Sequence, residues 1–338
     1  DHRQNTVQMH RLVQRDLIEQ MNAQEQATMR HAAHQLLAHA DPRTPERVTS
    51  WPRYSSLLTH VQASNAVECD DPWTRRLVLN EVWFLRARGD HAAALALGER
   101  AAEVWRERLG KDHEEVLAVD QQIARALLEQ GDDRERSYTM QVELVERYRR
   151  VLGEAHEDTL QAQSFLAIHH RNRGNFNQAR EMDQRVYETS LREFGADDPA
   201  TLLAAHNYAV SLRLAGDAVK ARELDHDTWQ RRIETLGEDH ILTLSTRNSF
   251  LLDLQETGKY EQALEGYEQL AEEVREQLGE KHPLTAQVSR NLCVTRRKKG
   301  DHKGAHALSS QLVSLAAELF GESSRQYLLA AVSHANDL

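Results

Sequence analysis

Apolar positions recur at helical spacing from about residue 71 to residue 321, and glycines interrupt them at fixed intervals. One set of glycines closes six helix-like segments at intervals of 42 or 43 residues: Gly89, Gly131, Gly174, Gly216, Gly258 and Gly300. A second set follows a Leu or Phe at the same intervals: Gly110, Gly153, Gly195, Gly237, Gly279 and Gly321. Two glycine ladders that stay in register predict an array of stacked supersecondary units.

Each unit contains two predicted helices. In the first, apolar or small residues stand twelve, eight, seven and four positions before the glycine, as in Val119, Ile123, Ala124 and Leu127, which is the stripe of a core-facing helix. In the second, a small residue recurs about five positions after the glycine: Ala94, Ser137, Ala179, Ala221, Ala263 and Ala305. We expect this small residue to let two helices approach closely, because a bulky side chain would overpack the contact.

The flanks of the array differ from it. Residues 6–10 are expected to form a short strand that leads into a helix from about residue 11. Further helices are expected over about 23–39 and 53–68, separated by a Pro-containing linker, and the last of these should cover the first unit. Residues 322–336 are expected to form an amphipathic capping helix with Tyr327, Leu328, Leu329 and Val332.

The composition is typical of an all-helical chain and indicates in which cellular environment it works. The 338 residues are 40% hydrophobic and 28% charged, with few prolines and glycines. A formal net charge of −11 argues against broad nucleic-acid binding, which needs a positive face. No apolar run approaches the roughly 20 residues that span a bilayer, so no membrane association is predicted. With two widely spaced cysteines and no signal-peptide core, we expect a cytoplasmic protein.

The repeating segments resemble a tetratricopeptide repeat in the form of about 42 residues that is found in kinesin light chains. The resemblance rests on Asn207-Tyr208-Ala209, Gly216-Asp217, Ala221 and Leu236-Gly237-Glu238-Asp239-His240, and it covers about residues 71–321. It implies an all-α, right-handed superhelical solenoid of six helix-turn-helix repeats, with an N-terminal helical extension and a C-terminal capping helix. It also implies a non-enzymatic protein that binds other proteins or peptides.

A second resemblance concerns the N-terminal segment. Residues Val7 to Gln14 are similar to the end of the winged-helix segment that follows an NB-ARC module in bacterial signalling ATPases, and Trp51, Leu57-Leu58 and His60 are similar to the linker behind it. A weaker resemblance is to the repeat proteins of FxSxx-COOH peptide systems. No G-x-x-x-x-G-K-[ST] motif occurs, so the chain is expected to be the sensor part of a longer NTPase.

These resemblances and the glycine ladders define the predicted divisions. They are 1–40 (remnant of the winged-helix-like segment), 41–70 (linker and packing helix), the six units, and 322–338 (capping helix). The unit boundaries are 71–110, 111–153, 154–195, 196–237, 238–279 and 280–321.

The residues offer little sign of catalysis, cofactors or metals. Four of the 18 histidines, His113, His156, His240 and His282, stand three residues after a repeat glycine. A residue that recurs in this way is predicted to cap the next helix or fill the turn rather than to bind metal. No serine elbow, phosphate loop or Cys-His spacing is present, and we expect no cofactor.

The candidate site lies on the first helices of the units, which line the concave surface of a tetratricopeptide superhelix. Asn and Arg recur as pairs nine and three positions before the glycine, and largely apolar residues stand six before it. The predicted peptide-binding residues are Asn80, Trp83, Arg86, Gln122, Arg125, Phe165, Arg171, His206, Asn207, Arg213, Asn248, Arg290, Asn291 and Arg297.

Amides can bind the backbone of an extended peptide, and arginines can bind acidic side chains or a free C-terminus. The predicted ligand is therefore an extended or acidic peptide. Two alternatives remain open: the arginines pair with carboxylates of neighbouring helices, or the chain is an assembly arm that self-associates without a peptide. An unrecognised hydrolase is a remote third.

Overall fold

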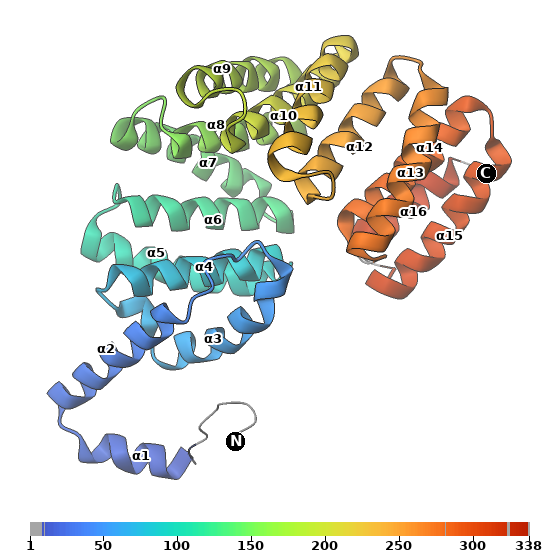
Figure 1. Cartoon of the computed structure of the whole chain (residues 1–338). Helices are drawn as coiled ribbons and strands as arrows, with labels where there is room; N and C mark the ends of the chain where they lie inside the picture. Colours follow the sequence, from blue (N-terminus) through green and yellow to red (C-terminus); the bar gives the residue numbers. More distant parts are fainter. Residues whose placement is uncertain (1–8, 10, 281, 323–324, 337–338) are drawn as a thin grey trace. The chain divides into compact units, whose positions relative to one another are not determined.

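The computed structural model describes residue 9 and residues 11–280, 282–322 and 325–336, and all regular secondary structure in these ranges is helical (Figure 1). The all-α prediction is therefore confirmed. The short strand expected over residues 6–10 falls outside the described residues, apart from Met9. The chain forms two compact units, unit 1 (Asp1–Gly153) and unit 2 (Glu154–Leu338), and each is described separately.

Unit 1 contains an N-terminal extension and two helix pairs. The extension consists of α1 (Arg11–Gln20), α2 (Ala23–His39), η1 (Val48–Ser50), α3 (Trp51–Ala63) and η2 (Ala66–Glu68). The pairs are α4 (Pro72–Ala87) with α5 (His91–Leu109), and α6 (Glu114–Gln130) with α7 (Arg134–Leu152). We call the first helix of each pair the A helix and the second the B helix.

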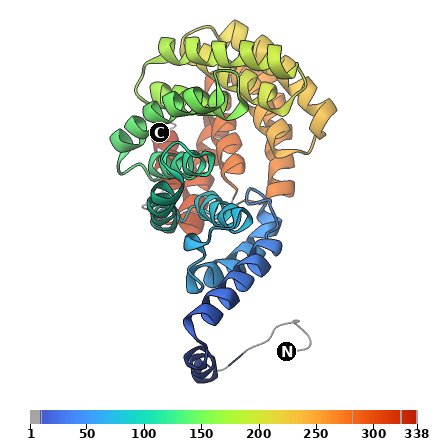
Figure 2. The ribbon, with the colours of Figure 1, turned by 90° about the vertical axis from the view of Figure 1, so that its left-hand side faces the viewer.

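Unit 2 contains four helix pairs and a terminal helix, and consecutive helices pack against each other along it (Figures 1 and 2). The pairs are α8 (Glu157–Asn172) with α9 (Phe176–Phe194), α10 (Pro199–Leu214) with α11 (Ala218–Leu236), α12 (Ile241–Glu256) with α13 (Tyr260–Leu278), and α14 (Pro283–Lys299) with α15 (His302–Phe320). The terminal helix α16 (Arg325–Ala335) packs on α14 and α15.

The two glycine ladders end the helices as the pattern predicts. All twelve ladder glycines have φ between 77° and 94°, a region that side chains with a Cβ rarely adopt. The small residue of each B helix is fully buried, at 0% exposure in all six pairs. Ser137, the one polar member, donates its hydroxyl hydrogen to the Ala124 carbonyl at 2.6 Å. The close helix approach inferred from these small residues is confirmed.

The repeated histidines cap helices, as predicted. In His113, His156, His240 and His282 the ring Nδ1 accepts a hydrogen bond from the backbone N–H two residues later, at 3.2–3.3 Å. Asp198 occupies the same position before α10 and accepts from the Ala200 N–H at 2.8 Å. An imidazole and a carboxylate thus serve the same N-terminal role, which is to satisfy a helix amide that has no partner within its own helix.

In the N-terminal extension, helix α3 is shorter than expected and the apolar residues of α1 are exposed. Helix α3 ends at Ala63 rather than near residue 68, because Asn65 adopts a left-handed conformation (φ 58°) and η2 follows it. Tyr54 of α3 stacks on Phe84 of α4, with ring centroids 5.5 Å apart, so α3 does cover the first pair. By contrast, α1 lies beyond the end of α2 in both views and leaves Leu12, Val13, Leu17 and Ile18 exposed (Figures 1 and 2).

The terminal helix α16 buries a different face from the one predicted. Leu328, Leu329 and Val332 are 55%, 40% and 62% exposed, whereas Ala330 is buried. His334 Nδ1 lies 2.9 Å from the Ser309 hydroxyl of α15. The helix therefore packs through small and polar side chains, and most of its large apolar residues remain on the surface.

No helix in the described ranges combines the length and apolar content needed to cross a bilayer. Within the same ranges, no group of three or more His, Cys, Asp or Glu side chains is placed to hold a metal ion.

Candidate functional site

Three of the predicted arginines are paired with carboxylates of the chain itself. Arg86 contacts Glu129 at 2.5 Å, Arg171 contacts Asp183 at 2.5 Å and Arg213 contacts Asp253 at 2.6 Å. Their side chains are only 7–12% exposed. This is the alternative left open by the sequence, and it removes the argument that these three positive charges await an acidic ligand.

In unit 2 these contacts form a regular series that joins neighbouring A helices. The side chain three positions before one repeat glycine reaches the side chain five positions before the next. Arg171 donates to Ser211 at 2.9 Å, and Arg213 donates to Asp253. In the following pair of repeats Thr295 donates to the Gln255 side-chain oxygen at 2.8 Å, so the same link is made without charge. These positions therefore fix the spacing of the A helices.

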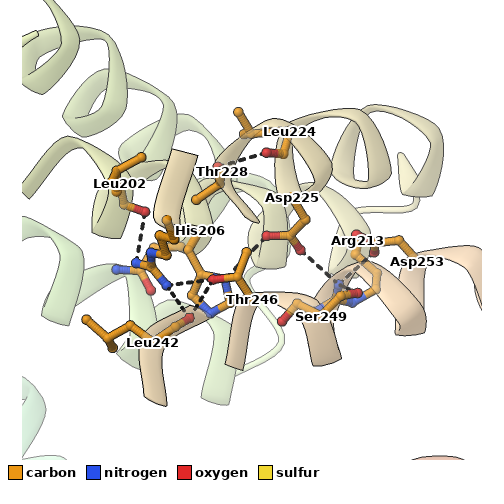
Figure 3. A network of polar contacts seen from close by, with 12 residues as sticks. Leu202, His206, Arg213, Leu224, Asp225, Thr228, Leu242, Thr246, Ser249 and Asp253 are labelled. Atoms are coloured by element: carbon orange, nitrogen blue, oxygen red, sulfur yellow. Dashed lines mark hydrogen bonds and ion pairs between the residues drawn. The ribbon is translucent and has the colours of Figure 1, made fainter. Parts of the chain in front are cut away.

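A network of polar contacts surrounds Asp225 of α11 (Figure 3). Asp225 lies 3.3 Å from His206 Nδ1 and 3.7 Å from the Arg213 guanidinium, which also contacts Asp253. Both carboxylates are fully buried. Burial and the neighbouring Asp225 charge raise the pKa of Asp253, and the Arg213 charge opposes this shift. One arginine thus compensates two carboxylates that water does not reach.

A second series of polar contacts joins the A and B helices of the same pair. It connects the residue ten positions before the glycine to a B-helix residue about nine positions after it. Gln121 and Gln141 exchange hydrogen bonds at 2.8 and 3.1 Å, and the Tyr267 hydroxyl donates to the Asn248 carbonyl at 3.2 Å. The His206–Asp225 contact is the equivalent in α10 and α11. His206 and Asn248 are therefore part of the scaffold.

Several predicted amides are also engaged internally. Asn80 is 4% exposed and donates to Asp41 of the α2–α3 loop at 2.7 Å. Gln122 accepts from Arg86 Nε at 3.0 Å, and Asn291 donates to the side chain of Asn248 at 2.9 Å. Each of these amides has at least one of its bonding groups occupied within its own unit.

The remaining predicted residues are all half-buried. Trp83 of unit 1 and Phe165 and Arg290 of unit 2 are partly accessible. Burial, followed by the repulsion of Arg86, lowers the pKa of Arg125 to about 9. The Arg297 guanidinium lies 3.5 Å from the Ser333 carbonyl of α16, so it too faces a neighbouring helix.

One column of the A helices is accessible in every repeat. The residue six positions before the glycine is half-buried in all six A helices: Trp83, Arg125, Ile168, Val210, Leu252 and Val294. In unit 2 the four members are all aliphatic, and they stand on consecutive A helices that pack against one another. We call Ile168, Val210, Leu252 and Val294 the aliphatic row. Its members keep contact with solvent although neighbouring columns are buried.

Asn207 stands beside this row, three residues before Val210 and on the same face of α10. It is half-buried, and its side-chain amide has no hydrogen-bond partner among the described residues. Its backbone carbonyl lies 3.4 Å from the Arg171 guanidinium, which holds this turn of α10 against α8. The amide is thus positioned by the scaffold and remains available for a ligand.

Sequence reasoning missed the partners of the arginines. Asp183 and Asp225 lie nine residues after a glycine and four after the small buried residue of the B helix, on its core-facing stripe. A charged residue at a core position of one helix, with an arginine in the facing helix, was the available signal. Asp253 likewise occupies a fully buried position on α12.

A scan against protein-family models matches the tetratricopeptide repeat over residues 84–135, 158–225 and 252–318, which is more than half of the chain. None of the curated protein sequences matches this chain significantly.

Solved structures with the same fold include the following three. A variant of the nearly identical TPR-like repeats of a Podosopora anserina "putative kinesin light chain" is 21% identical, with a TM-score of 0.50, covering 60% of this chain and 94% of that chain. NprR in complex with its cognate peptide NprX is 13% identical, with a TM-score of 0.58, covering 89% and 82%. A Rap protein complexed with Competence and Sporulation Factor is 12% identical, with a TM-score of 0.59, covering 96% and 88%. The family match and the helix pairs together establish that this chain belongs to the tetratricopeptide repeat family.

Proposed function

We propose that this chain is a peptide-binding scaffold whose ligand lies across the A helices of unit 2. The observation that supports this proposal is the aliphatic row, which is half-exposed on consecutive A helices beside the Asn207 amide. An extended segment can place alternate apolar side chains on such a row, and a side-chain amide can bond both the N–H and the C=O of its backbone.

The internal pairing of the arginines changes the expected ligand. Because Arg171 and Arg213 are already compensated by buried aspartates, acidic side chains in the ligand are not required there. The proposed ligand is therefore an extended peptide with small or medium apolar side chains rather than a mainly acidic one. The role is binding rather than catalysis.

Two of the structural neighbours support this reading by analogy of fold. NprR was solved in complex with its cognate peptide NprX, and the Rap protein was solved in complex with Competence and Sporulation Factor. A more specific proposal is that ligand binding controls a module joined to residues 1–40, the remnant predicted to follow an NB-ARC domain. That proposal rests on the sequence resemblance alone.

Self-association is a second candidate, and one observation favours it. The large apolar residues of α1 and α16 are exposed at opposite ends of the chain, including Leu12, Ile18 and Val332. Patches of this kind often mark contacts between proteins. A chain that serves only as an assembly arm would form concentration-dependent oligomers and bind no peptide through Asn207.

The peptide proposal can be tested with a phage-displayed library of random twelve-residue peptides. Among the peptides selected on the intact chain, a class with apolar side chains should bind the Asn207→Ala variant about tenfold more weakly, because one or two backbone hydrogen bonds are lost. The matched control is Asn177→Ala, which removes an exposed amide from α9 and should leave affinity unchanged. Fluorescence anisotropy of the labelled peptides measures both, and equal affinity for all three proteins would contradict the proposal.

A further inference from the structure

The fifth helix pair departs from the others at two facing positions. Eight residues after the repeat glycine, or nine in the second pair with its one extra residue, the B helices carry a long apolar side chain in five pairs: Leu97, Met140, Met182, Leu224 and Leu308. The fifth pair has Gly266 there. Seven residues before the glycine, the A helices carry Val82, Ala124, Ala167, Ala209 and Cys293, whereas the fifth has Leu251.

These two exceptions compensate each other in volume. A Cβ added to Gly266 would lie 2.3 Å from Leu251 Cδ2, so the leucine side chain of the A helix occupies the space that the B helix fills elsewhere. The exchange keeps the core closed, since Leu251 is only 4% exposed. As a result, α13 has no bulky side chain on its outward side at this position.

A groove lies at this place. It has a volume of about 360 Å³, is lined by residues of α11, α12 and α13, and has Gly266 and Leu251 in its wall. Trp229 and Phe250 stack with ring centroids 5.6 Å apart and supply its aromatic side. We call it the Gly266 groove. It involves neither Asn207 nor the aliphatic row, apart from sharing helix α12.

The charges around the Gly266 groove are mainly negative. Helix α13 exposes five glutamates: Glu261, Glu265, Glu268, Glu272 and Glu276. Two of these are already paired, Glu268 with Arg296 and Glu261 with Lys299. Glu265 lines the groove and makes no ion pair with any described residue. The Arg247 guanidinium, also in the lining, is already held by Glu273 at 2.7 Å and by Gln269 at 3.2 Å. The unbalanced charge at the rim is therefore acidic, as is the chain as a whole, with a net charge of −11.

From this geometry we infer that the Gly266 groove is a second docking site, which receives a basic protein segment with one leucine or methionine anchor. The anchor enters where the other pairs carry their own leucine or methionine, and it packs on Trp229 and Leu251. Lysine or arginine beside the anchor pairs with Glu265. Charge complementarity selects this occupant over a second copy of the same acidic chain.

The preceding helix pair indicates which substitutions would close the groove. Leu251→Ala combined with Gly266→Leu recreates the Ala209 and Leu224 arrangement of the preceding pair. It moves a leucine from the A helix to the B helix, so the total core volume is nearly conserved and the fold is expected to survive. Gly266→Leu alone should lower the melting temperature because of the close approach to Leu251. Glu265→Lys is a further variant that reverses the rim charge without touching the core.

The test uses a phage-displayed library of random twelve-residue peptides on the intact chain. Clones that lose binding on the double variant are expected to combine a leucine or methionine with adjacent lysine or arginine. Their synthetic peptides should bind the double variant and the Glu265→Lys variant at least about tenfold more weakly. They should still bind Asn207→Ala normally, which separates this site from the one proposed on the A helices.

The inference would be overturned if no clone distinguished the intact chain from the Glu265→Lys and double variants. It would equally be overturned if the distinguishing clones lacked basic residues or a large apolar anchor. Thermal unfolding of each variant by circular dichroism establishes that a loss of binding does not arise from unfolding, and the Glu265→Lys result stands even if the double variant is unstable.

Discussion

Replacing Glu81 with leucine should stabilise unit 1, by about 3–4 kcal/mol at pH 7. Glu81 is fully buried in α4, and neither carboxylate oxygen has a hydrogen-bond partner among the described residues. Burial, reinforced by the Asp41 charge, raises the pKa of Glu81 to about 9 from its ordinary value of 4.5. Leu166 and Leu292 occupy the same repeat position in two other A helices, so a leucine fits this column.

The pH dependence follows from the direction of the shift. The folded state retains a proton on Glu81 between about pH 4.5 and 9, whereas the unfolded state releases it, so stability falls as pH rises through this window. At pH 7 the pH is about 2.5 units above 4.5, the ordinary pKa of Glu81 in the unfolded state. Each unit lowers the free energy of unfolding by about 1.4 kcal/mol, which gives the figure above. Glu81→Leu should abolish this loss and should gain little at pH 4.5.

Urea unfolding at pH 5, 7 and 8.5 measures the effect. Glu103→Gln, which removes an exposed carboxylate from α5 of the same unit, is the control and should leave the pH dependence unchanged. If Glu81→Leu destabilised the chain equally at every pH, a contact that keeps Glu81 charged would have to exist, and the account of its burial would be wrong.

Replacing Arg213 with methionine should cost about 3–5 kcal/mol at about pH 9, because it leaves Asp225 and Asp253 buried without their shared cation. The cost should shrink from pH 9 toward pH 6, because burial and the Asp225 charge raise the pKa of Asp253 to about 8, and its protonation removes the repulsion between the two carboxylates. His206 stays beside Asp225 and can compensate only one of them. Denaturant unfolding across this pH range measures the change.

The neutral link between Gln255 and Thr295 provides the matched control. Arg213→Gln combined with Asp253→Thr copies that pair one repeat earlier and should recover most of the lost stability, because no buried charge is left unpaired within the link. A single Arg213→Met variant within about 1 kcal/mol of the original chain would show that the arginine is not part of the structural series.

The parts of the fold that follow from periodicity could be predicted from the sequence. They include the glycine ladders and the small buried residue of each B helix, which recur six times, and the histidine caps, which recur four times. A residue that recurs in this way has the same structural role in every helix pair, so the pattern itself reveals that role. The end of α3 was less predictable, because the left-handed Asn65 interrupts a pattern that continues to be apolar. The exposed face of α16 likewise depends on which neighbouring surface remained uncovered.

The candidate site was only partly predictable, for a different reason. The sequence shows that Arg171 and Arg213 recur on one face of the A helices, but their charge is compensated by residues 12 and 40 positions away. Pairing over such distances depends on how the helices pack. The aliphatic row and Asn207 were recognisable because their exposure depends on position within the repeat, whereas Glu81 and Gly266 are exceptions to the repeat and had to be found by comparing the pairs in the structure.

The central claim is that a peptide binds across the aliphatic row, and the most direct test is the affinity of a library-selected peptide for the Val210→Glu/Leu252→Glu double variant. Both side chains are half-exposed on consecutive A helices, so the fold should tolerate the change, which circular dichroism can verify. We predict a loss of about 100-fold or more, because two charges would lie under the apolar contacts of the ligand. An unchanged affinity in a folded variant would contradict the proposed site.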